Sequence, residues 1–146
     1  MRLYLDMCVL KRPFDDQSQE RVAAETRAVL AVIERIDRGL DNLVWSSALT
    51  FENQEDPEAE PRMEVAKYAA RASMRQTLSA QIEQRMRELS ALGLPPLDAA
   101  HLAFAEAAGC DVLLSCDDRF IRRARRVNTM IRVLTPLEYW NEVADD

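Results

Sequence analysis

Four short apolar runs alternate along the chain with longer segments of helical periodicity. The runs are residues 2–5, 43–45, 111–115 and 131–134. Strands that alternate with helices pair in parallel, because each connection crosses over one face of the sheet. Such strands are buried on both faces, which fits runs in which most residues are apolar. The pattern therefore predicts an α/β fold with a central, mainly parallel sheet covered by helices.

The segments between these runs show helical spacing and helix boundary signals. Apolar residues recur at helical spacing over residues 22–40, with Ser18 placed to cap this helix and Gly39 to end it. Pro57 and Pro61 bracket an acidic loop. The Ser46-Ser47 pair can cap a short helix that holds Glu52. Further helices are predicted over 62–73 and 79–92, from Asp98 to Gly109, after Asp118, and from Pro136 to about Val143.

Size and composition favour a single domain over residues 1–146. With 146 residues, 48% of them hydrophobic, the chain is long enough for one proper core. The three cysteines, Cys8, Cys110 and Cys116, lack a metal-binding spacing and are expected to be buried thiols. The sequence shows no signal peptide and no run of about 18 apolar residues, so we expect a cytoplasmic protein without a membrane span.

Four acids share one position relative to the predicted elements. Asp6 ends the first strand, Glu52 lies just beyond the second, Asp98 stands at a helix start, and Asp117 follows the strand at 111–115. The carboxyl ends of parallel strands meet at one edge of the sheet, where open α/β folds bind ligands. Carboxylates gathered there repel one another unless a divalent cation holds them, and Mg²⁺ or Mn²⁺ prefers oxygen ligands. If these acids converge, they form a metal site suited to phosphodiester hydrolysis.

Each acid also has a local role that competes with this interpretation. The helix dipole stabilises an acid such as Asp98 in a first turn, and aspartates such as Asp117 are good helix caps. Glu52 on a helix can simply be solvated. Asp6 is harder to explain locally, because an acid beside an apolar strand needs a partner.

The same segments resemble the PIN-domain nucleases, the family that includes the VapC-like toxins of bacterial toxin-antitoxin pairs. The resemblance covers almost the whole chain and is carried by residues 3–10, Glu52, residues 98–103 and residues 113–120. The stretch Arg12-Pro13-Phe14-Asp15-Asp16-Gln17 is also similar to a bacterial subgroup of the family.

This resemblance implies a three-layer α/β/α sandwich and a divalent-metal-dependent endoribonuclease that cuts single-stranded RNA. By this analogy Asp6, Glu52, Asp98 and Asp117 are the catalytic acids and hold Mg²⁺ or Mn²⁺, directly or through water. Glu55 can be aligned in place of Glu52, and Asp118 in place of Asp117. The resemblance also implies an antitoxin protein as a partner and a homodimer as an assembly.

The chain departs from the family pattern beside two of these acids. Two residues past Asp6, where the family has a small hydroxyl or amide residue, stands Cys8. The threonine common before the last acid is replaced by the pair Ser115-Cys116, in which Ser115 could keep the hydroxyl. The altered Met7-Cys8 pair motivates an alternative function, a catalytically degenerate PIN-like module that binds RNA or a protein. A haloacid-dehalogenase-like phosphatase is disfavoured, because that family has an aspartate at the position of Cys8.

Basic residues follow the last acid closely, although the net charge of −6 repels nucleic acid overall. Five arginines lie within eight positions: Arg119, Arg122, Arg123, Arg125 and Arg126. Arginine forks bind phosphate, so we expect Arg119, Arg122 and Arg123 to contact RNA, with Lys11 and Arg12 adding to this surface. The alternative is a solvated helix face paired with acids.

The single histidine, His101, lies three residues after Asp98 and therefore on a related helix face. We expect it to be a hydrogen-bonded packing residue rather than a general base or a metal ligand.

Overall fold

A parallel sheet forms the centre of the molecule. The computed structural model describes residues 1–145. Within them, five strands are arranged in the order β3-β2-β1-β4-β5, and every neighbouring pair is parallel. The strands are β1 (Arg2–Leu5), β2 (Asn42–Ser46), β3 (Met74–Gln76), β4 (Val112–Leu114) and β5 (Arg132–Leu134).

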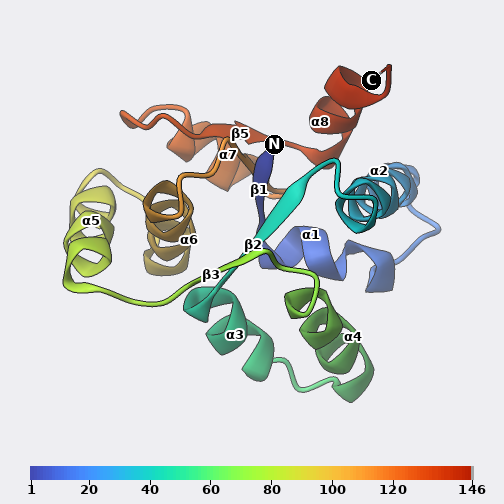
Figure 1. Cartoon of the computed structure of the whole chain (residues 1–146), viewed down its shortest axis with the longest axis horizontal. Coiled ribbons are helices and arrows are strands. Elements are labelled where there is room, and N and C mark those ends of the chain that lie inside the picture. Colours follow the sequence, from blue (N-terminus) through green and yellow to red (C-terminus); the bar gives the residue numbers. More distant parts are fainter. Residues whose placement is uncertain (146) are drawn as a thin grey trace.

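Helices cover both faces of this sheet. They are α1 (Met7–Lys11), the 3₁₀ helix η1 (Arg12–Phe14), α2 (Glu20–Asp37), α3 (Ser47–Gln54), α4 (Ala59–Ala69), α5 (Ala80–Ala91), α6 (Pro96–Ala107), α7 (Asp118–Ala124) and α8 (Pro136–Val143). Figure 1 shows α5 and α6 on one side of the sheet and α2 with α8 on the other. The predicted three-layer α/β/α sandwich is confirmed.

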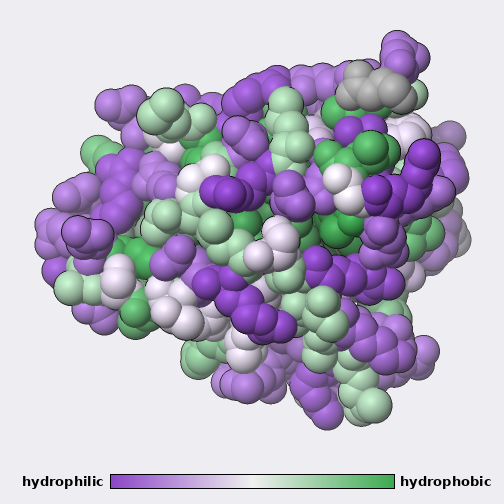
Figure 2. Space-filling view, in the orientation of Figure 1, coloured by the Kyte–Doolittle hydropathy of each residue, from purple (hydrophilic) through white to green (hydrophobic). Residues whose placement is uncertain are grey.

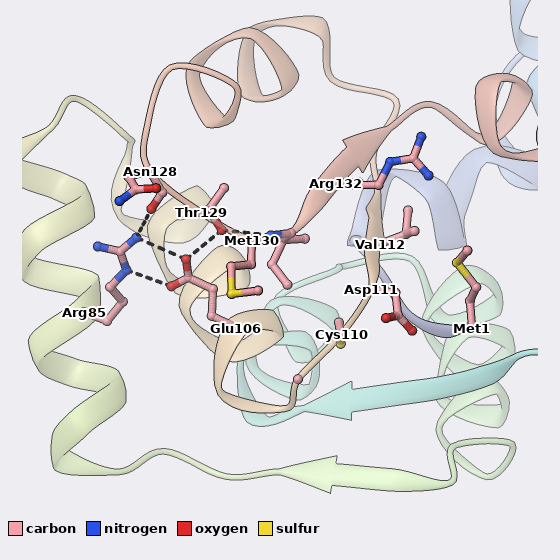
Figure 3. A pocket seen from close by; sticks show the side chains of 12 residues that line it. Met1, Arg85, Glu106, Cys110, Asp111, Val112, Asn128, Thr129, Met130 and Arg132 are labelled. Atoms are coloured by element: carbon pink, nitrogen blue, oxygen red, sulfur yellow. Dashed lines mark hydrogen bonds and ion pairs between the residues drawn. The ribbon is translucent and has the colours of Figure 1, made fainter.

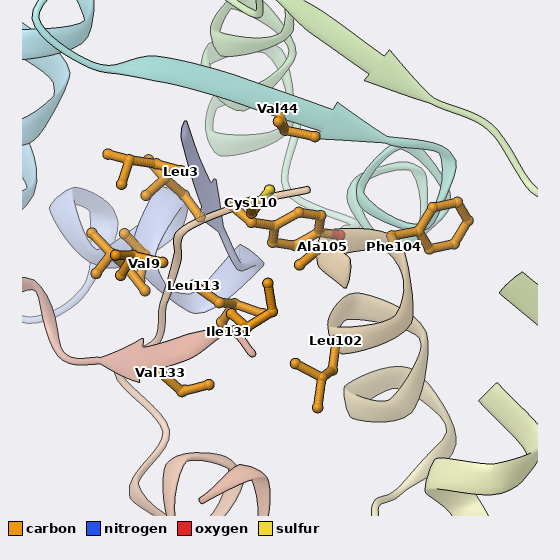
Figure 4. Packing of buried hydrophobic residues seen from close by; sticks show 14 of the residues in the cluster. Leu3, Val9, Val44, Leu102, Phe104, Ala105, Cys110, Leu113, Ile131 and Val133 are labelled. Carbon is orange, nitrogen blue, oxygen red and sulfur yellow. The ribbon is translucent and has the colours of Figure 1, made fainter. Parts of the chain in front are cut away.

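The core lies between the sheet and these helices. Leu3, Tyr4 and Leu5 of β1 are fully buried, and so are all three residues of β4. In Figure 4, Leu102 and Ala105 of α6 point toward strand residues such as Leu113. Figure 2 shows apolar residues scattered among polar ones on the surface of one face. None of the helices in residues 1–145 is long and apolar enough to span a membrane.

The sequence pattern misses β3 and extends the preceding helix too far. It predicts a helix over residues 62–73, but α4 ends at Ala69, and β3 pairs with β2 through the register Val44↔Met74. A three-residue edge strand with partly exposed side chains carries no apolar run of its own. Its conformation depends on the backbone groups that the edge of β2 offers.

Two boundary predictions are also wrong. Gln19, not Ser18, precedes α2, and the Ser18 hydroxyl donates to Asp16 instead. Pro61 lies inside the first turn of α4 rather than at the end of a loop. A proline is tolerated there, because the backbone N–H groups of a first turn have no helical acceptor. Gly39 does end α2, with a positive φ of 77°.

The strand order creates a switch point between β1 and β4. From β1 the chain builds outward through β2 and β3, whereas β4 and β5 extend the sheet in the other direction. Leu5 pairs with Leu114 at the carboxyl ends of these two strands, and the Asp6 N–H donates to the Leu114 carbonyl at 3.1 Å. Ligands of doubly wound folds bind in the crevice at such a point.

Candidate active site

Asp6 lies at this switch point, directly after β1, and caps α1. Its Oδ1 accepts the backbone N–H groups of Cys8 at 3.1 Å and Val9 at 3.4 Å. The residue is only 6% exposed. Burial, with smaller contributions from Cys8, raises the pKa of Asp6 well above its ordinary value. A nearby cation would stabilise the charged form of such a buried acid.

Cys8 supports Asp6 from the next turn. Its thiol lies 2.6 Å from Asp6 Oδ1, and its sulfur accepts the backbone N–H of Cys116 at 3.2 Å. The Ser115 hydroxyl lies 3.5 Å from the same sulfur. A thiol both donates and accepts hydrogen bonds, although weakly, so Cys8 can replace the hydroxyl residue that the family pattern places there.

Asp117 follows β4 and caps α7. Its Oδ1 accepts the backbone N–H groups of Arg119 at 2.9 Å and Phe120 at 3.3 Å, and its own N–H donates to the Ser115 hydroxyl at 3.0 Å. The adjacent Asp118 faces elsewhere and forms a bidentate ion pair with Arg21, at 2.9 and 2.8 Å. The structure thus favours Asp117 over Asp118 as the acid of the site.

Asp98 is the third residue of α6 and is half-buried. Burial and then the charge of Asp117 raise the pKa of Asp98, and the charge of Glu52 adds to the increase. The positive charge of Arg123 opposes these effects. Asp98 begins α6, Asp117 follows β4 and Glu52 lies on α3 after β2, so the order of the elements puts these three acids toward the carboxyl edge of the sheet.

Glu52 reaches the same edge from α3. Its Oε1 lies 2.7 Å from Nε2 of His101, and its side chain is 28% exposed. Glu55, the alternative from the sequence, is exposed and stands at the carboxyl end of α3. The contact with His101 therefore favours Glu52.

His101 is buried and uses both ring nitrogens. Nδ1 lies 2.6 Å from the Tyr4 hydroxyl, which in turn lies 2.6 Å from the Ser46 hydroxyl. Burial raises the pKa of Tyr4 well above its ordinary value, so its hydroxyl keeps its proton. The sequence indicates a packing role for His101, and no sequence signal connects it with Glu52 or with Tyr4.

The donor atoms at this edge fit a hard divalent cation. The candidate ligands are carboxylate oxygens, and Asp98 receives no hydrogen bond from the described residues. Within residues 1–145, no three His, Cys, Asp or Glu side chains already form a compact metal site. The charges of Asp117 and Glu52 act on Asp98, and the oxygens of these carboxylates are of the type that would hold such a cation.

Comparison with known proteins identifies the family. The sequence profile of the PIN domain matches residues 3–126, most of the chain. The chain belongs to the PIN domain family. Among solved structures, the PIN domain is similar to a chain in the crystal structure of VapBC2 from Rickettsia felis bound to a DNA fragment from their promoter, with a TM-score of 0.61 and 13% identity. The match covers 91% of this chain and 98% of that one, and no curated protein matches.

The basic residues of this PIN domain differ in how far they are already neutralised. Lys11 is paired with Asp56, and Arg12 is paired with Asp15 and Glu25. These two are therefore poorer phosphate ligands than the sequence suggests. Among the described residues, the side chains of Arg119, Arg122, Arg123 and Arg126 form no ion pair within 4 Å.

A pocket of about 720 Å³ lies at the opposite end of the PIN domain sheet. Met1, Asp111 and Arg132, which line it, stand at the amino ends of the strands, and an ion pair between Arg85 and Glu106 forms one wall (Figure 3). None of the four candidate acids lines this pocket. The candidate site and this cavity therefore lie at opposite ends of the sheet.

Proposed function

We propose that this PIN domain is a divalent-metal-dependent endoribonuclease that hydrolyses phosphodiester bonds of single-stranded RNA. The observation that supports the proposal is the order of the elements: Asp6 and Asp117 follow β1 and β4 at the switch point, Glu52 lies on the helix after β2, and Asp98 begins α6. PIN domains are nucleases, which agrees with this site. The same four acids would hold Mg²⁺ or Mn²⁺.

The side chains of the site have different roles. When bound, the cation activates water and neutralises charge on the scissile phosphate. Asp6 and Asp117 keep fixed orientations because Oδ1 of each is already held by backbone N–H groups. Asp98 has no such restraint and can adjust to the cation. Glu52 is held by His101.

The arginines of α7 would bring the RNA backbone to these acids. Asp117 caps α7, so Arg119 and Arg122 lie in the first two turns of the helix that starts at the site. The positive charge of Arg123 acts on Asp98. Among the described residues these guanidinium groups form no ion pair within 4 Å, so they can bind phosphate although the chain carries a net charge of −6.

The decisive experiment pairs each candidate acid with a neighbouring acid of the same type. Purified protein is incubated with single-stranded RNA and Mn²⁺ or Mg²⁺, and cleavage is followed on gels. We expect Asp6→Asn, Asp98→Asn, Glu52→Gln and Asp117→Asn to reduce the rate at least about 100-fold. The matched controls Glu55→Gln and Asp118→Asn should retain the rate. If the wild-type protein shows no metal-dependent cleavage, or if Asp6→Asn leaves the cleavage unchanged, the proposal is refuted and a degenerate binding module remains.

We further propose that this nuclease is the toxin of a toxin-antitoxin pair. The structural likeness to a chain of the VapBC2 complex supports this proposal. Production of the chain in a bacterial host should arrest growth, and co-production of a short protein encoded beside it should restore growth and form a complex that copurifies. Growth arrest that persists in Asp98→Asn would contradict the proposal.

A further inference from the structure

A continuous chain of hydrogen bonds ends at Glu52. It starts at the backbone N–H of Leu49, which donates to the Ser46 hydroxyl at 3.1 Å. It continues through Tyr4 and His101, with contacts of 2.6, 2.6 and 2.7 Å, to Oε1 of Glu52. Ser46 is 1% exposed, Tyr4 0% and His101 3%, so the links among these three residues are shielded from water, whereas Glu52 at the end is 28% exposed.

The donors and acceptors available to these residues give the hydrogen-bond chain one direction. The Leu49 N–H already occupies an acceptor site on Ser46, so the Ser46 hydroxyl can donate to the Tyr4 oxygen. The Tyr4 hydroxyl then donates to Nδ1 of His101, so Nε2 is the ring nitrogen that donates to Glu52. In the opposite direction the Ser46 proton would be buried without a partner among the described residues, at a cost of about 1–3 kcal/mol.

The hydrogen-bond chain joins the elements that carry three of the four acids, Asp6, Glu52 and Asp98. Ser46 caps α3, the helix of Glu52, while Tyr4 lies two residues before Asp6 on the same face of β1. His101 lies one helical turn after Asp98 on α6. The contact between His101 and Glu52 therefore fixes the position of α3 relative to both β1 and α6.

We propose that His101, oriented by Tyr4 and Ser46, is a positioning residue that holds the Glu52 carboxylate toward the metal site. Glu52 comes from a helix that otherwise ends in an exposed turn, and His101 Nε2 is the hydrogen-bond donor that the structure gives its side chain. The Nε2–H leaves Oε2 available to a cation. This inference rests on the proposed function, because it assigns Glu52 to the metal site.

The first test measures the imidazole itself and needs no metal. His101 is the single histidine of the chain, so ¹⁵N-labelled protein gives two ring nitrogen signals without further assignment. We expect the Nε2–H tautomer in the wild type, and a mixture of tautomers in Tyr4→Phe, which lacks the orienting hydroxyl. An Nδ1–H tautomer in the wild type would overturn the proposal.

The second test uses two side-chain amides as matched replacements. In His101→Gln the amide nitrogen takes the place of Nε2 and can still donate to Glu52. In His101→Asn it takes the place of Nδ1 and cannot reach Glu52. Calorimetry with Mn²⁺ should show affinity about 10-fold or more weaker for His101→Asn, with recovery toward the wild type in His101→Gln. For RNA cleavage, kcat should fall in the same order while KM stays constant. Thermal unfolding reports the structural cost of each variant.

The last comparison separates positioning from general structural support. In a Glu52→Gln background, His101→Asn should add no further loss of Mn²⁺ affinity, because both changes remove the same contribution. If His101→Asn weakens Mn²⁺ binding in the Glu52→Gln background as much as it does in the wild type, the positioning role is overturned. Wild-type Mn²⁺ affinity in His101→Asn would overturn it as well. Absence of Mn²⁺ binding by the wild type would instead refute the proposed function, while the tautomer still decides the direction of the hydrogen-bond chain.

Discussion

The Cys8 thiol lies 2.6 Å from Oδ1 of Asp6, and its sulfur accepts the backbone N–H of Cys116 at 3.2 Å. Cys8 thus links the end of β1 to the end of β4, the two strands at the switch point. The residue that departs most from the family pattern keeps the hydrogen-bonding capacity that this position requires. This contact agrees with our proposal of an active enzyme, because Cys8 was the reason for considering a degenerate binding module.

Replacement of Cys8 should separate hydrogen bonding from packing. Cys8→Ser keeps a donor for Asp6 and should retain RNA cleavage within a few-fold of the wild type. Cys8→Ala removes it and should lower kcat about 10-fold, the usual size for loss of a group that orients a metal ligand. Initial cleavage rates with Mn²⁺ test this, and equal rates for Ser and Ala would show that the thiol contact is not used.

Removal of the Asp6 charge should stabilise the metal-free protein. The raised pKa means that the folded state binds a proton more readily than the unfolded chain, so stability falls as pH rises from about 4 through the folded-state pKa. At pH 7, Asp6→Asn should raise Tm by about 2–4 °C, which corresponds to about 1 kcal/mol. Asparagine still caps α1 through its oxygen. Thermal unfolding in EDTA measures the change, and Mn²⁺ should stabilise only the wild type.

The α7 arginines should control RNA affinity through charge. Arg119→Gln combined with Arg122→Gln should weaken RNA binding and reduce the slope of log affinity against log salt by about 1 for each phosphate that is no longer neutralised. Arg38→Gln is the matched control, because Arg38 is exposed at the far end of α2, on the side of the amino ends of the strands. Binding titrations with catalytically inactive Asp98→Asn protein avoid cleavage. An equal effect of Arg38→Gln would indicate a general charge effect instead.

Asp41 should stabilise the fold, with a clear dependence on pH. Burial opposes its charge, but hydrogen bonds from Arg35, at 2.9 Å, and from the amino terminus lower the pKa of Asp41. The stabilisation is therefore present above the unfolded-state pKa of about 3.9 and disappears as pH falls through the folded-state pKa. Asp41→Asn should cost about 3 kcal/mol at pH 7 and less near pH 3. Urea unfolding tests this against Asp37→Asn, an exposed pair with Arg71 that should cost under about 1 kcal/mol.

Apolar runs, helix caps and prolines in the sequence predict most of the strands and helices. The apolar runs at β1, β2, β4 and β5 are buried strands, and the cap at Ser46 and the helix start at Pro136 lie where the sequence indicates. The strand that these patterns miss, β3, depends on pairing with β2. Its own residues favour no conformation strongly enough to predict it.

Neighbours along the chain are enough to predict that four acids follow strands or begin helices, because each of these positions is defined within its own segment. The placement of β1 beside β4, which brings Cys8 to Ser115 and Cys116, comes from the tertiary structure alone. So do the neutralisation of Lys11 and the contacts that join His101 to Tyr4, 97 positions away, and to Glu52, 49 positions away. Such contacts depend on strand order and helix packing, which bring together residues that are far apart in the sequence. The local sequence around one of these residues does not predict its partner.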